Sequence, residues 1–123
     1  MLKQLLLVGL GGGIGSILRY LTSVCLSKYF SFIFPLATFT VNILGCFLMG
    51  LLFSLTAKYN LLNNDLKFLL MIGFCGGYTT FSAFSIDNMQ LIGNGNYLIS
   101  GIYIVGSVLL GIAAVWLGSI LLK

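Results

Sequence analysis

The sequence predicts an all-α integral membrane protein with four transmembrane helices, the third of them broken near residues 76–80. Three observations support this fold class. Of the 123 residues, 59% are hydrophobic and 7% are charged, which is far more apolar than an ordinary soluble domain. The apolar residues form four runs, each close to the roughly 20 that a membrane-spanning helix needs. The third run changes partway into glycines and hydroxyl residues, and backbone that leaves a helix at membrane depth must be sheltered by protein or line a polar cavity.

The four predicted spans cover residues 4–26, 32–57, 66–85 and 97–122, so the whole chain, 1–123, forms a single four-helix membrane domain. Lys3 precedes the first run as in a signal peptide, but the run is too long and has no small-residue cleavage site, so we expect a retained helix. The connections are short, which predicts that successive helices are antiparallel neighbours.

The charged residues indicate how the spans are oriented. One side of the bundle would carry Asp65 and four lysines, namely Lys3, Lys58, Lys67 and Lys123, and the other side Lys28 and Asp87. This imbalance predicts that both termini lie in the cytoplasm. The net charge of +4 comes from basic residues scattered at span ends, which is not the patch that a nucleic-acid-binding protein needs.

The composition also excludes most enzymes. The chain has no histidine and only two carboxylates, so the usual acid, base and metal-ligand sets cannot be assembled. The three cysteines lie inside apolar runs without paired-ligand spacing and are expected to be small buried hydrophobic residues: Cys25, Cys46 and Cys75. We therefore expect neither catalysis nor an organic cofactor.

The third run contains the most informative segment, GFCGGYTTFSAFSID, at residues 73–87. Phe81 and Phe84 are three residues apart and share a helix face if the helix resumes after the glycines. Core packing is the ordinary explanation for such rings. Here Thr80 and Ser82 alternate with them, and the positive ring edges together with hydroxyl donors could replace part of the hydration shell of an anion.

Other polar side chains also lie within the spans, and two of them have two interpretations each. Asn42 either forms an interhelical hydrogen bond or offers an amide donor to a permeating anion. Arg19 either lines an anion path or extends to the headgroups near Lys28. Tyr103 and Ser107 are four residues apart and place two hydroxyls on one face of the last helix.

Three ordered motifs, GGGIGSILRY (11–20), TFTVNILGCFLMG (38–50) and GFCGGYTTFSAFS (73–85), resemble the Fluc family of fluoride channels, also called CrcB. The resemblance implies a dual-topology homodimer in the bacterial cell membrane. Its antiparallel subunits would enclose two pores that export fluoride passively and reduce fluoride toxicity. A heterodimer with a related chain remains an alternative, because the lysine imbalance disfavours insertion in both orientations.

Matched by motif, the resemblance implies that Asn42, Phe81 and Phe84 line the anion pathway. Thr80 and Ser82 would be hydroxyl contacts beside them, and Tyr103 with Ser107 would form a polar track. It also implies a structural Na⁺ at the dimer centre, held by the backbone carbonyls of Gly76 and Thr79. The chain departs from the family pattern at 37–39, which read Ala-Thr-Phe instead of Gly-Thr-Leu, and at Ala83, where threonine is usual.

Two rival functions remain. A small multidrug transporter is also a short four-helix protein, but it needs a carboxylate embedded in the membrane, whereas Asp65 and Asp87 are expected at span ends. A membrane scaffold without transport activity would have no use for the polar interruption of the third run.

Overall fold

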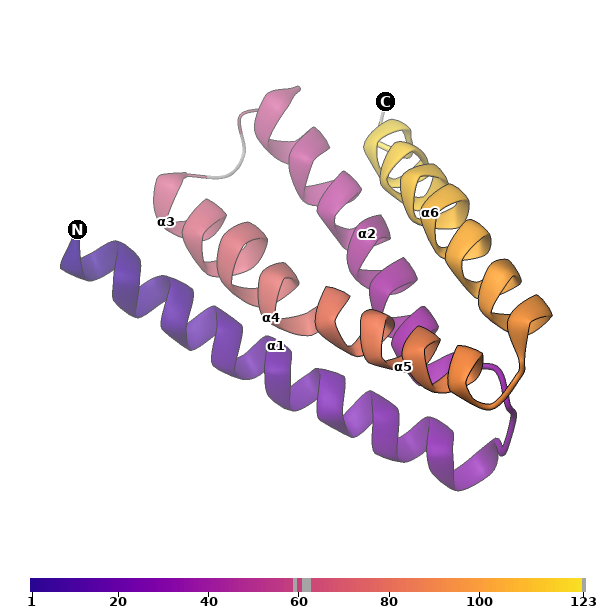
Figure 1. Cartoon of the computed structure of the whole chain (residues 1–123). Coiled ribbons are helices and arrows are strands. Elements are labelled where there is room, and N and C mark those ends of the chain that lie inside the picture. The colour runs from indigo at the N-terminus through magenta and orange to yellow at the C-terminus, as the bar shows by residue number, and fades with distance from the viewer. Residues whose placement is uncertain (59, 61–62, 123) are drawn as a thin grey trace.

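The computed structural model describes residues 1–58, 60 and 63–122, so Lys123 of the predicted lysine-rich side lies outside the described residues. Within them, four helical segments are long and apolar enough to cross a membrane: Leu2–Tyr29, Leu36–Ala57, Asn64–Gly93 and Tyr97–Ile120. The first, second and fourth are the continuous helices α1 (Leu2–Tyr29), α2 (Leu36–Ala57) and α6 (Tyr97–Ile120). The predicted fold class, four apolar helices with one interrupted, is confirmed (Figure 1).

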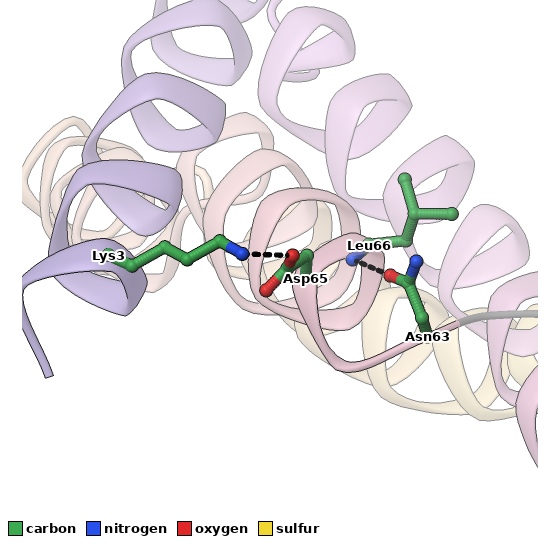
Figure 2. A network of polar contacts seen from close by, with 4 residues as sticks. All are labelled: Lys3, Asn63, Asp65 and Leu66. Atoms are coloured by element: carbon green, nitrogen blue, oxygen red, sulfur yellow. Dashed lines mark hydrogen bonds and ion pairs between the residues drawn. The ribbon is translucent and has the colours of Figure 1, made fainter.

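The third span consists of four pieces: α3 (Asn64–Leu66), the π-helical η1 (Lys67–Cys75), α4 (Gly76–Tyr78) and α5 (Phe81–Gly93). Figure 2 shows how it begins: the side-chain oxygen of Asn63 accepts a hydrogen bond from the Leu66 N–H at 2.8 Å, and Lys3 pairs with Asp65 at 2.7 Å. The Asn63 cap satisfies one of the free donors of the first turn. The ion pair is exposed and contributes little to stability.

The break lies inside the predicted interval, but threonines form it. Thr79 (φ −85°, ψ 159°) and Thr80 (φ −153°, ψ 123°) are extended, whereas Gly76 and Gly77 remain helical. The predicted interval, residues 76–80, contains both the glycines and the threonines. Gly77 instead allows close packing, because a Cβ atom there would lie 2.9 Å from the Cα atom of Gly12 on α1.

The closest packing joins alternate spans, α1 with η1 and α2 with α6. In the second pair, Cys46 lies opposite Gly111 and Gly50 opposite Val115, so both helices advance in the same direction, as Figure 1 shows. Successive spans are in contact, as the short connections predicted, but alternate spans pack more closely. The small residues that allow backbones to approach lie on the faces between alternate spans, and only weaker contacts join α1 to α2.

The helix after the break is longer than the predicted third span, which ended at residue 85. Because α5 continues to Gly93, Asp87 and Asn88 lie in a helix and not in a connecting loop. The Ser100 hydroxyl donates to Asn88 Oδ1 at 2.8 Å, and Asn88 Nδ2 donates to the Phe84 carbonyl at 2.9 Å. This buried bridge joins α5 to α6 and holds the second half of the third span beside the last helix.

Candidate functional site

The break leaves some backbone groups without helical hydrogen-bond partners, and Thr79 and Thr80 at the break supply hydrogen bonds to part of them. The Thr79 N–H and the Thr79 hydroxyl both donate to the Cys75 carbonyl, at 3.1 Å and 2.8 Å. After the break, the Thr80 hydroxyl accepts from the Ala83 N–H at 3.2 Å and so caps α5, and it also lies 3.2 Å from the Ser82 hydroxyl. Threonine suits this place because its side chain competes with the backbone for hydrogen bonds.

Asn42 reaches from α2 and pairs with both backbone groups of Thr80. The Thr80 N–H donates to Asn42 Oδ1 at 2.8 Å, and Asn42 Nδ2 donates to the Thr80 carbonyl at 3.1 Å. The side-chain amide therefore acts as a substitute for a second peptide group. An amide nitrogen has two hydrogens, and this pair uses one of them, so a second donor remains at the same position.

Two other carbonyls at the break are free to bind something else. Within the described part of the chain, neither the Gly76 carbonyl nor the Thr79 carbonyl accepts a hydrogen bond. Gly76 loses its helical donor because the Thr80 N–H is taken by Asn42. Unwound backbone carbonyls at membrane depth are the groups that coordinate Na⁺ in transport proteins, so the predicted pair of ligands has the right chemistry.

A cavity of about 300 Å³ lies between α2, α5 and α6, beside the break. Its lining includes five residues of the predicted pathway, together with Cys46, Thr79 and Val108. The five are Asn42, Thr80, Phe81, Phe84 and Ser107. The hydroxyl oxygen of Ser107 is buried without a hydrogen-bond partner among the described residues. A buried hydroxyl without a partner is costly, and this one lies where a passing ligand could satisfy it.

Three aromatic rings form a row along this site. The ring centroids of Phe81 and Phe84 are 5.6 Å apart, and those of Phe84 and Tyr103 are 4.9 Å apart. Tyr103 is fully buried, while Phe81 is 78% exposed. The row therefore begins in the core and ends at the surface of the single chain.

The sequence did not reveal the partner of Tyr103. Its hydroxyl donates to Asp87 Oδ2 at 2.9 Å, so a carboxylate lies at the buried end of the aromatic row. The prediction had placed Asp87 at the end of a span. A signal was available, since Asp87 lies three residues after Phe84 and shares its face if the helix is extended.

A second cavity of about 270 Å³ adjoins the first at Thr80, and Arg19 lies in its wall with Ser16, Ser23 and Thr38. The guanidinium Nε donates to the Gly77 carbonyl at 3.1 Å. This contact anchors the Arg19 side chain at the end of α4, beside the break. The predicted residues are thus brought together around the break, with Ser82 joined through Thr80, Tyr103 through Phe84, and Arg19 in the adjoining cavity.

The chain matches the family model described as "CrcB-like protein, Camphor Resistance (CrcB)" over residues 6–119. It is 50% identical over 122 residues to the fluoride-specific ion channel FluC of Flavobacterium psychrophilum, covering 99% of this chain and 98% of that protein. It is also 50% identical over 117 residues to FluC of Phocaeicola vulgatus, with 95% and 96% covered. The resemblance drawn from the three motifs is confirmed, and the chain belongs to the CrcB family of membrane proteins.

Proposed function

We propose that this chain is a fluoride-specific ion channel of the cell membrane, which lets fluoride leave a bacterial cell passively along its electrochemical gradient. The observation that carries the proposal is the cavity at the break, where an amide, hydroxyls and two phenylalanine rings meet. The relatives named FluC are fluoride-specific channels over essentially the same length of chain. These findings favour a channel over a multidrug transporter or a scaffold.

The donors in this cavity suit a small, strongly hydrated anion. The unpartnered Ser107 hydroxyl and the second Asn42 N–H are available to replace water, and the Thr80 and Ser82 hydroxyls adjoin them. The edges of Phe81 and Phe84 add weak positive potential. A filter built this way selects an ion when its lining repays the lost hydration, and we propose that this lining repays the hydration of fluoride and not that of the larger chloride.

We further propose that Tyr103 and Arg19 belong to the same pathway at its margins. Tyr103 packs against Phe84 and directs its hydroxyl to Asp87, so it sets the buried end of the aromatic row. Arg19 lines the adjoining cavity and keeps a full positive charge near the break.

A second copy of the chain would complete the pathway. Phe81 is 78% exposed although it lies at the break with polar neighbours, and a single four-helix bundle has little interior to enclose a polar route. An antiparallel homodimer would cover this face. A heterodimer with a related chain would cover it equally, so the identity of the partner is decided by experiment.

The same dimer would create a cation site. Two free carbonyls from each subunit, those of Gly76 and Thr79, would form a four-oxygen cage at the dimer centre, with ligands of the kind that Na⁺ binds in membrane proteins. A resident Na⁺ would hold the two breaks together and add positive potential between two anion paths. No organic cofactor is needed for passive conduction.

Ion flux from proteoliposomes tests the function. We expect fluoride efflux, measured with an ion-selective electrode, to greatly exceed chloride efflux, because the lining of a fluoride-selective path must repay the larger hydration energy of fluoride. Phe81→Ile and Phe84→Ile should each depress the fluoride flux. Equal fluoride and chloride fluxes would rule out a selective channel.

A further inference from the structure

Arg19 forms a hydrogen bond to α4, directly before the break in the third span. Its Nε, on α1, donates to the carbonyl oxygen of Gly77 at 3.1 Å, and the side chain is half-buried. In a continuous helix this carbonyl would accept from Phe81, four residues ahead, but Phe81 starts a new helix after the extended threonines. Arg19 therefore supplies the donor that the break removes.

We propose that Arg19 is a positioning residue for the break, and that it acts through its Nε–H and not through its charge. The contact holds the peptide group that follows Gly77 in one orientation. The free carbonyls of Gly76 and Thr79 lie on either side of that group along the chain. In this respect the inference rests on the proposed function, because those carbonyls matter for conduction only if they bind the central cation.

The Arg19 contact complements the one made by Asn42. Asn42 holds Thr80 from α2, by its N–H and its carbonyl, whereas Arg19 holds Gly77 from α1. The break is thus tethered on both sides by helices that do not belong to the third span. Its geometry is set within one chain, before any second chain or cation arrives.

Electrostatics alone could also keep Arg19 in place, since a helix end that exposes carbonyls carries partial negative charge. The two explanations differ in which substitutions should succeed. In glutamine the amide nitrogen stands as many bonds from Cα as Nε does in arginine, so Arg19→Gln keeps a donor there without the charge. Arg19→Lys keeps the charge but has a methylene at that position, and Arg19→Met has neither.

Hydrogen exchange of the peptide covering residues 73–85, followed by mass spectrometry on the purified full-length protein, reports the break directly. We expect Arg19→Gln to exchange within about threefold of the unsubstituted chain, and Arg19→Met and Arg19→Lys to exchange about tenfold faster, as the loss of one hydrogen bond implies. Fluoride flux in proteoliposomes should follow the same order. Lys28→Gln, which removes an exposed charge from the same helix, should leave both quantities unchanged.

The reverse order, with slow hydrogen exchange in Arg19→Lys and fast exchange in Arg19→Gln, would overturn the inference. It would show that Arg19 acts through its charge. Equal exchange in all the variants, or equal loss in all three Arg19 variants, would overturn it as well. If Arg19→Met does not fold, the comparison of glutamine with lysine still decides. Absence of fluoride flux in the unsubstituted chain would refute the proposed function, whereas the exchange experiment would still test the role of Arg19.

Discussion

Ser107 and Ser54 each carry a buried hydroxyl oxygen without a hydrogen-bond partner among the described residues, but only Ser107 lines the cavity at the break. The sequence predicted Ser107 from its spacing to Tyr103. It could not predict the orphaned state of the hydroxyl, because the satisfaction of a polar atom depends on neighbours brought by other helices. The same limit applied to Asn42, whose two interpretations are both compatible with the observed pair to Thr80 and its spare N–H.

The two serines form a matched test of function at the residue scale. We expect Ser107→Ala to lower fluoride flux about tenfold, since a hydrogen bond to a charged partner is worth roughly 1.5 to 3 kcal/mol. Ser54→Ala makes the same chemical change away from the cavity and should leave the flux unchanged. Both variants should raise thermal stability slightly, because each removes an unsatisfied buried group. Equal fluxes for the two variants would argue against a pore role for Ser107.

At the scale of elements, the position of the break in the third span was predictable. Which residues leave the helical conformation there was not. A run of glycines and hydroxyl residues within an apolar span indicates interrupted helix, and residues 76–80 bracket the observed position. The pattern did not distinguish which of the glycines and threonines in this interval leave the helical conformation. Gly77 is helical and packs closely against Gly12 of another helix, and a local sequence pattern does not contain that contact.

Substitutions at Thr79 separate the backbone of the break from its side chain. Proline would remove the N–H that donates to the Cys75 carbonyl and would disfavour the helical conformation of the preceding Tyr78, so we expect Thr79→Pro to lower dimer yield and fluoride flux about tenfold or more. Thr79→Ser keeps the N–H, the carbonyl and the hydroxyl and should be mild. Size-exclusion chromatography and flux measure the two effects. Equal behaviour of the two variants would exclude the proposed carbonyl site.

At the scale of the whole molecule, four spans followed directly from hydropathy, which is a property of each segment alone. The pairing of spans did not follow, since short connections indicate only which helices are consecutive. The glycine faces on α1 and α2 match the third span and α6 respectively, and this matching depends on shape. For the same reason the segment between the predicted spans 66–85 and 97–122 contains helix: Asn88 is polar in the sequence but bonded to Ser100 in the fold.

The orientation of the chain in the membrane distinguishes the two kinds of dimer. A dual-topology homodimer predicts that Lys28→Cys, at the last turn of α1, is labelled by a membrane-impermeant maleimide in about half of the molecules in intact cells, and in all of them after permeabilisation. The unsubstituted chain, with its own three cysteines, supplies the background. Complete labelling from outside would follow the lysine imbalance and require a differently oriented, related partner.

The interleaved pairing of spans also limits how the protein can be made. The first two helices leave the ribosome with their small-residue faces open, because the partners of both are still untranslated. The break cannot be tethered until the third span emerges beside α1 and α2, and Ser107 and Tyr103 join the site only with α6. A transcript truncated before the fourth span would therefore encode three spans that lack Tyr103, Ser107 and the α6 wall of the cavity.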